Sequence, residues 1–102
     1  MAKEMTSEQV RAKLLPHASE LRADGVLHLA LHGSVARGEE TPESDVDLIA
    51  ELDRTRMISL IGFIHLENRL TDILGVKVDL SDQTALRPEV AENAERDSVR
   101  VF

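Results

Sequence analysis

The 102-residue chain has no cysteine, tryptophan or tyrosine, and its only aromatic residues are Phe63 and Phe102. The absence of cysteine excludes disulfides and thiolate chemistry, and it leaves the redox compartment unmarked. The lack of aromatic side chains removes the stacking platforms that usually hold single-stranded nucleic acids. Aliphatic packing must therefore supply the core.

Basic charge is also scarce. The chain has 12 Lys and Arg residues against 19 Asp and Glu residues, and its net charge is -7 at pH 7. Such a chain has no general attraction for nucleic acids or anionic membranes. No apolar run approaches the roughly 20 residues that cross a bilayer, and the polar residues 1–10 do not resemble a signal peptide. We expect a cytoplasmic protein of one domain, residues 1–102, without nucleic-acid or membrane partners.

The hydrophobic pattern alternates between helical and extended segments. A capped helix that begins at Thr6 or Ser7 is interrupted by Pro16 and ends at Gly25. The remaining expected elements are a buried strand over 26–32, a strand over 45–51, a long helix over 54–74, an alternating strand over 76–80, a helix starting near Pro88, and a short strand or docked tail over 98–102. We find no internal repeat and no domain boundary.

The long helix carries two apolar stripes, which are Met57, Leu60, Ile61 and Ile64, and then Phe63, Leu66, Leu70, Ile73 and Leu74. Together they are wider than a surface helix needs. We assign both mainly to the core, and an interface with another chain is left open for part of them.

A glycine-rich turn follows the first strand, with the sequence Gly33-Ser34-Val35-Ala36-Arg37-Gly38. Gly33 permits a tight turn with close backbone approach. A short helix opening at Ser34 would present free backbone N–H groups, which are a natural seat for phosphate. We expect Gly33 and Ser34 to hold the phosphates of a nucleotide. Arg37 pairs either with phosphate or, as we favour, with a local carboxylate.

Two carboxylates come next. Asp45 and Asp47 are two residues apart on an expected strand, so their side chains project to the same face. Asp79 lies opposite the apolar residues of its own strand and reaches the same cluster if the two strands are neighbours. Three such carboxylates suit two Mg²⁺ ions, or Mn²⁺, roughly 3.5–4 Å apart, as used for displacement at phosphorus. Asp79 is also the candidate for taking the acceptor's hydroxyl proton.

The combined pattern resembles the signature of the DNA polymerase beta-like nucleotidyltransferase superfamily. It consists of Gly33-Ser34-x-x-Arg37-Gly38 followed by Ser44-Asp45-x-Asp47-Leu48, and the short length is similar to that of its minimal nucleotidyltransferases, the MNT domain proteins. The resemblance implies an α/β (α+β) fold in which helices flank a small mixed sheet. It also implies transfer of a nucleoside monophosphate to a hydroxyl with Mg²⁺. The positions that match the family's functional residues are Gly33, Ser34, Asp45, Asp47 and Asp79.

Many proteins of this family are antitoxins that accompany a HEPN-domain ribonuclease toxin. The resemblance therefore implies transfer of AMP from ATP to a tyrosine of such a toxin. Two alternatives stay open: neutralisation of the toxin by binding alone, and transfer to a small-molecule acceptor. A chain this short has no second domain, so we expect a partner or a second copy to complete the site.

The four histidines, His17, His28, His32 and His65, show no metal-ligand spacing. His32 adjoins the glycine turn, so a nucleotide contact is open to it. We interpret it as a structural histidine whose hydrogen bonds are satisfied.

Overall fold

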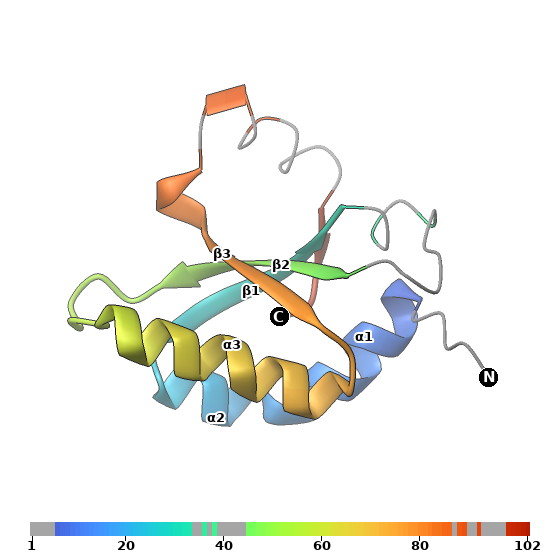
Figure 1. The fold of residues 1–102 in the computed structure, drawn as a ribbon, viewed down its shortest axis with the longest axis horizontal. Coiled ribbons are helices and arrows are strands. Elements are labelled where there is room, and N and C mark those ends of the chain that lie inside the picture. Colours follow the sequence, from blue (N-terminus) through green and yellow to red (C-terminus); the bar gives the residue numbers. More distant parts are fainter. Residues whose placement is uncertain are drawn as a thin grey trace.

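The computed structural model describes residues 6–33, 36, 38, 45–86, 88–89, 92 and 98–102. Helices lie against one face of a twisted sheet (Figure 1). The elements in chain order are α1 (Ser7–Leu14), a 3₁₀ turn (Leu15–His17), α2 (Ala18–Ala23), β1 (Val26–His32), β2 (Val46–Leu52), α3 (Leu60–Leu74), β3 (Val78–Asp82), a second 3₁₀ turn (Gln83–Ala85) and β4 (Val99–Arg100). Among the described residues, none of these helices is long and apolar enough to cross a membrane.

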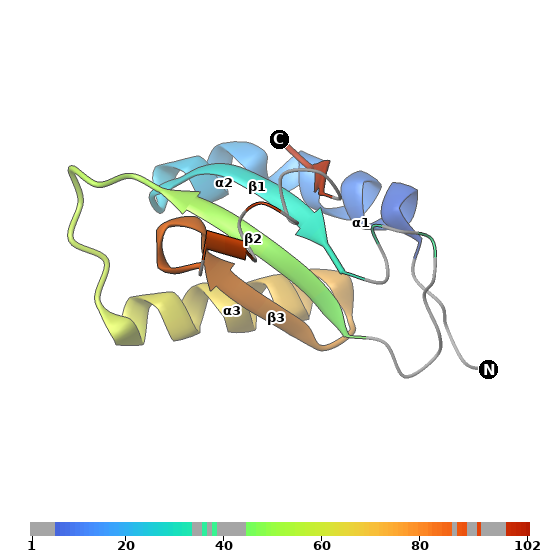
Figure 2. The same ribbon diagram turned by 90° about the horizontal axis from the view of Figure 1, so that it is seen from above.

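The four strands form one mixed sheet in the order β3-β2-β1-β4. β1 is antiparallel to both β2 and β4, whereas β2 and β3 are parallel. A parallel pair needs a long crossover connection, and α3 supplies it along the sheet (Figure 2). The mixed sheet with flanking helices confirms the fold that the sequence resemblance implied.

The core lies between the sheet and the helices and is almost entirely aliphatic. Its fully buried side chains include Leu14, Leu21, Leu29, Leu31, Leu48, Leu70 and Leu74. Because side chains alternate along a strand, the residues between the core positions of β1 and β2 face away from the helices. The polar residues of the strands are therefore gathered on the opposite face of the sheet.

The first helical segment is divided as predicted. Thr6 and Gln9 form a capping box at the start of α1, and Pro16 lies in the 3₁₀ turn that separates α1 from α2. Proline cannot donate a backbone hydrogen bond inside a helix, which explains the division.

The long helix is shorter than predicted, because α3 begins at Leu60 rather than at Arg54. Asp53 Oδ1 accepts hydrogen bonds from the backbone and hydroxyl of Thr55, which turns the chain before the helix. Ser59 then caps the helix by accepting from the Gly62 amide at 3.0 Å.

The expectation that both stripes of this helix are buried in the core was wrong for the first stripe. Its side chains, Met57, Leu60, Ile61 and Ile64, are exposed. In the second stripe Leu66, Leu70 and Leu74 are buried, and Phe63 and Ile73 pack partly buried against the core. The helix therefore needs only the narrower stripe to attach to the sheet.

Two side chains of α3 hold the outer edge of β3. The Leu80 amide donates to Glu67 Oε2 at 2.9 Å, and the Val78 amide donates to Thr71 Oγ1 at 3.3 Å. Outward amides of an edge strand have no strand partner, and an unpaired buried amide costs free energy. These two bonds fix β3 against α3 and therefore fix the position of Asp79 between them.

The C-terminal end combines the two predicted forms. Val99 and Arg100 pair with β1 as β4, and Val101 and Phe102 are buried behind it. The loop 39–44 lies outside the described residues, and so does most of the helix predicted to begin near Pro88.

Candidate functional site

Gly33 follows β1 directly and meets Asp47 of β2. Its φ is +82°, a conformation that favours glycine. A Cβ added to Gly33 would collide with Asp47 Oδ2 and lie 3.2 Å from Asp47 Cγ. The predicted tight turn with close approach is therefore present, and the approaching group is a candidate catalytic carboxylate. Ser34 and Arg37, and the short helix expected there, lie outside the described residues.

Asp47 and Asp79 are brought level with each other by the sheet. In the parallel pair of β2 and β3, Asp47 is the register partner of Asp79. Val78 and Leu80 are buried while Asp79 is exposed, so Asp79 faces away from the core as predicted. Register partners on adjacent strands project to the same face, and this face therefore carries both carboxylates.

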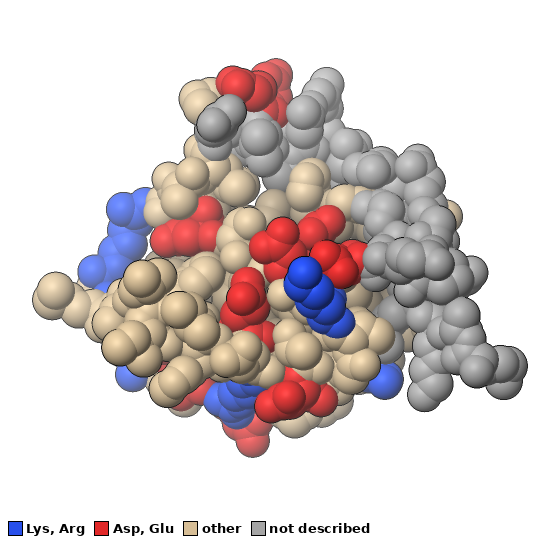
Figure 3. Space-filling view, viewed as in Figure 1, with Lys and Arg blue, Asp and Glu red and all other residues tan. Residues whose placement is uncertain are grey.

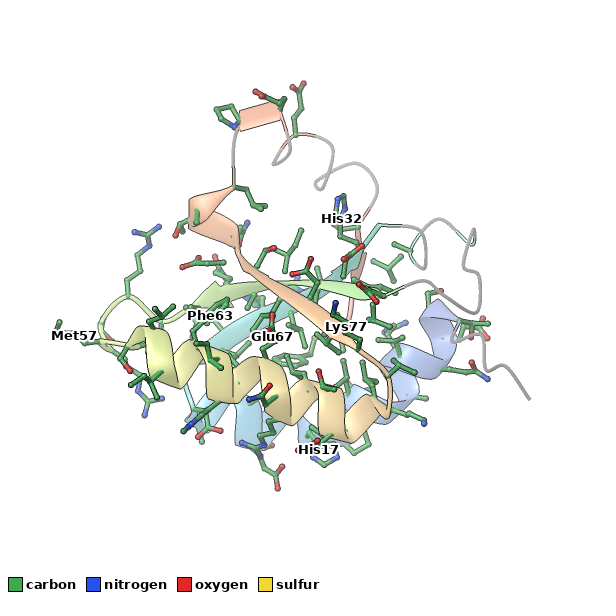
Figure 4. All side chains as sticks on the ribbon, viewed as in Figure 1. His17, His32, Met57, Phe63, Glu67 and Lys77 are labelled. Carbon is green, nitrogen blue, oxygen red and sulfur yellow. The ribbon has the colours of Figure 1, made fainter. Side chains whose placement is uncertain are left out.

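Asp45 lies just before β2 and is paired with a lysine. Lys77 Nζ is 3.7 Å from Asp45 Oδ2, and both side chains are largely exposed. Figure 3 shows one basic side chain surrounded by acidic ones on this face, and Figure 4 labels Lys77 there. Within the described ranges, no three His, Asp or Glu side chains are grouped closely enough to hold a metal ion. The joint ion site of Asp45, Asp47 and Asp79 stays a prediction.

His32 is the register partner of Asp47 on the other side, across the antiparallel pair of β1 and β2. Its Nδ1 is buried and has no hydrogen-bond partner among the residues that the structure describes. The interpretation of His32 as a satisfied structural histidine was therefore wrong for this nitrogen. Figure 4 shows the ring on the side of the sheet away from α3. A buried, unpaired polar atom beside a carboxylate suits contact with a ligand.

A hollow of about 600 Å³ lies on the same face, farther along β1 and β2. Ala30 and Ile49 are among its lining residues, and they are register partners two residues from the His32–Asp47 pair. Its polar lining includes His28 and Glu51, whose Nε2 and Oε2 are 3.4 Å apart, together with Arg100 and Glu92. The size falls in the range of small-molecule sites. Sequence reasoning missed these lining residues, although period-two counting back from His32 would have found His28.

The site thus combines a glycine turn with carboxylates on neighbouring strands, on the free face of a mixed sheet. This arrangement defines the nucleotidyltransferase class. A family model described as "Nucleotidyltransferase domain" matches residues 12–101. The chain belongs to this family, and it is a nucleotidyltransferase.

Relatives and solved structures agree with this assignment. The chain is 36% identical over 98 residues to "Protein adenylyltransferase MntA" of Thermococcus cleftensis, with 95% of this chain and 97% of the relative covered. A structure described as a minimal nucleotidyltransferase matches with a TM-score of 0.78 at 32% identity, and covers 93% of this chain and 95% of that one.

More distant structures share the fold. A toxin–antitoxin complex with AMP-PNP matches with a TM-score of 0.72 at 19% identity, over 90% of this chain and 72% of the other. A chain from the structure described as a tri-AMPylated Shewanella oneidensis HEPN toxin in complex with MNT antitoxin matches with a TM-score of 0.66 at 16% identity. The match covers 91% of this chain and 71% of the other.

Proposed function

We propose that this nucleotidyltransferase moves AMP from ATP to a hydroxyl group of a partner HEPN-domain toxin, most simply a tyrosine, and so acts as its antitoxin. The observation that carries the chemistry is the contact of the Asp47 carboxylate with Gly33, level with Asp79 on the next strand. The relative named as a protein adenylyltransferase supports AMP as the transferred group. The fold neighbours in HEPN complexes support the partner.

The residues around the glycine turn would bind the nucleotide. In the proposal, the backbone of Gly33 and the hydroxyl of Ser34 hold the outer phosphates of ATP. His32 Nδ1, buried and unpaired among the described residues, lies beside this site and provides a further polar contact. The hollow beyond Ala30 and Ile49 gives the substrates room on the same face.

The carboxylates match a divalent cation in their chemistry, because they are hard oxygen donors that need a neutralising charge, although within the described residues they are not grouped closely enough to share one ion. In the proposed scheme, two Mg²⁺ ions would be held by Asp45, Asp47 and Asp79. The bound ions would neutralise the charge that develops on the phosphates. Lys77 supplies a positive group to Asp45 in the structure, and a bound Mg²⁺ would replace this weak, exposed ion pair.

The transfer itself balances as a substitution at phosphorus. The acceptor oxygen forms a bond to the α-phosphorus, the bond to the β-phosphate oxygen breaks, and pyrophosphate leaves. Asp79 lies on β3, the outermost of the strands that carry the site, where an acceptor can approach it. Its carboxylate takes the proton from the acceptor hydroxyl.

The decisive experiment incubates the purified chain with ATP, Mg²⁺ and a ribonuclease-inactivated HEPN-domain toxin, and measures the intact mass of each protein. We expect the toxin to gain AMP and Asp47→Asn to abolish the gain. Because the chain contains no tyrosine, any AMP-tyrosine in the mixture comes from the partner.

The same experiment separates the alternatives. Neutralisation of the active toxin by Asp47→Asn as complete as by the wild type would show that binding alone suffices. AMP transfer to an added small hydroxyl compound, with none to the toxin, would identify a small-molecule acceptor instead.

A further inference from the structure

An exposed apolar ridge lies at the start of α3. We define it as Met57, Leu60, Ile61 and Ile64, whose side chains are 102, 76, 67 and 45% exposed. Leu60, Ile61 and Ile64 are three or four residues apart and share one stripe of α3, adjacent to the stripe that this helix buries in the core, and Met57 lies just before the helix. Large aliphatic side chains gathered in this way on a small protein mark an interaction site.

Two hollows of about 430 Å³ each flank the apolar ridge. Met57 and His65 help to line one of them, and Leu60 and Phe63 help to line the other. Figure 4 shows Met57 projecting from the tip of the molecule. A convex stripe with a concavity on either side offers the contact surface on which an apolar helix face packs.

Two arginines, Arg54 and Arg56, lie just before the apolar ridge, although the chain as a whole is acidic. From Arg54 to Leu66 the sequence has no Asp or Glu. Arg54 makes no ion pair with any residue that the structure describes, and Arg56 donates to the carbonyl of Ala23 rather than to a carboxylate.

Among the neighbouring carboxylates, Asp53 compensates part of this charge, because, besides the hydrogen bonds from Thr55, the positive charge of Arg56 helps to lower the pKa of Asp53. Asp53 accepts from Thr55, Asp24 pairs with Arg69, and Asp82 accepts from Thr84, as the structure records for each pair. The guanidinium of Arg54, which has no ion pair among the described residues, is therefore available to a carboxylate from another molecule.

We propose that the apolar ridge is the docking surface for a protein whose contact face is apolar at its centre and bordered by Asp or Glu. The inference rests on the proposed function in taking this protein to be the toxin that accepts AMP. A second copy fits poorly, because its own Arg54 and Arg56 would approach those of the first copy.

The position of the apolar ridge separates docking from chemistry. Leu60 begins α3, whereas Asp79 lies beside Glu67 and Thr71, about two to three turns farther along this helix. Asp47 lies near the start of β2, whereas the chain reaches the apolar ridge only after the end of that strand. A substitution in the ridge can therefore remove docking without touching Gly33, Asp47 or Asp79.

The test measures binding of the ribonuclease-inactivated HEPN toxin by calorimetry, with full-length variants of this chain. We expect Ile61→Glu to weaken binding about 30-fold or more, as for a central interface residue. Leu15→Glu is the matched control, because Leu15 is also a large exposed aliphatic side chain, 49% exposed and outside the ridge. It should bind like the wild type, and melting temperatures should show that both variants fold.

Charge reversal tests the border. Arg54→Glu should weaken binding and reduce its dependence on salt concentration, because rim charges act mainly through screened electrostatics. Arg11→Glu, on the exposed side of α1, is the control and should leave both unchanged.

The outcomes separate this inference from the proposed function. The docking surface is overturned if Ile61→Glu binds the toxin as well as the wild type does, or if the wild type does not bind the toxin at all. It is also overturned if the wild type is a dimer that Ile61→Glu converts to a monomer. If Ile61→Glu removes docking and the wild type transfers no AMP, the docking surface is supported and the proposed transfer is overturned. The Asp47→Asn variant should bind the toxin normally.

Discussion

Asp47 of β2 and Asp79 of β3 are register partners in the parallel half of the sheet, so two acidic side chains are held side by side on its free face. Like charges in this position repel each other, and a fold keeps them only if another interaction compensates. We therefore expect the two carboxylates to be required for activity and not for stability.

Neutralising either carboxylate should remove activity and preserve the fold. We expect Asp47→Asn and Asp79→Asn to lower AMP transfer by more than about 100-fold, since they alter groups closer to the chemistry than the outer-shell residues whose loss costs 10–100-fold. Thermal unfolding should show no loss of stability. Asp72→Asn, on the exposed side of α3, is the control and should keep full activity.

Replacing Gly33 should affect both stability and activity. Gly33→Ala forces a left-handed backbone conformation on an ordinary residue, at a cost of about 1–2 kcal/mol, and also displaces the Asp47 carboxylate. Gly75→Ala is the matched control, because Gly75 has φ +74° and no atom within 4 Å of an added Cβ. Both variants should lose stability, and only Gly33→Ala should lose AMP transfer. Equal activity of the two would contradict the proposed role of the turn.

The bond between Glu67 and the Leu80 amide should be measurable. Glu67→Ala leaves this edge amide without its partner and should lower the free energy of unfolding by about 1–2 kcal/mol. Hydrogen exchange of the Leu80 amide should become faster. Asn68→Ala, on the exposed side of the same turn, should change neither quantity, and unchanged exchange in Glu67→Ala would show that the bond does not form in solution.

The two stripes of α3 should respond differently to truncation. Leu70 is fully buried whereas Leu60 is 76% exposed. Leu70→Ala should cost about 2–5 kcal/mol through the cavity that it leaves. Leu60→Ala should stay within about 0.5 kcal/mol of the wild type, as is usual for surface positions. Urea unfolding measures both, and similar losses for the two would mean that the apolar ridge is covered within the chain.

The turn before α3 makes a pH-dependent contribution to stability. Hydrogen bonds from the Thr55 hydroxyl, and then from its backbone amide, lower the pKa of Asp53. A carboxyl whose pKa is lower in the folded state stabilises the fold fully above its unfolded pKa, and this contribution disappears as pH falls through the folded value. We expect the difference in melting temperature between wild type and Thr55→Val to be largest above about pH 4 and to shrink below it. A constant difference would contradict this assignment.

The strands, and the face of the sheet on which the candidate site residues lie, could be predicted from the sequence because local patterns determine them. Val26 to His32 forms the first strand as predicted, and Asp79 could be assigned to the polar face because Val78 and Leu80 alternate with it. The choice of β2 as neighbour of β3 is a long-range feature, and the prediction had to assume it.

Other features depend on tertiary contacts that no local pattern contains. The start of α3 was missed because Asp53 and Ser59 form local side-chain bonds that compete with helix formation. The exposure of Ile61 could not be foreseen, because an apolar stripe has the same spacing whether the fold or a partner covers it. The hollow near Ala30 arises from segments distant in sequence, so no motif marks it.

The hydrogen bonds of Glu67 and Thr71 have a consequence for assembly. Exposed edge strands commonly recruit a strand from another molecule and so extend their sheet. In this chain two amides that such a recruited strand would need, those of Val78 and Leu80, already donate to α3 side chains. The sheet is therefore protected from lengthening at its β3 edge, and a neighbouring molecule has to associate through side chains rather than through continued backbone pairing there.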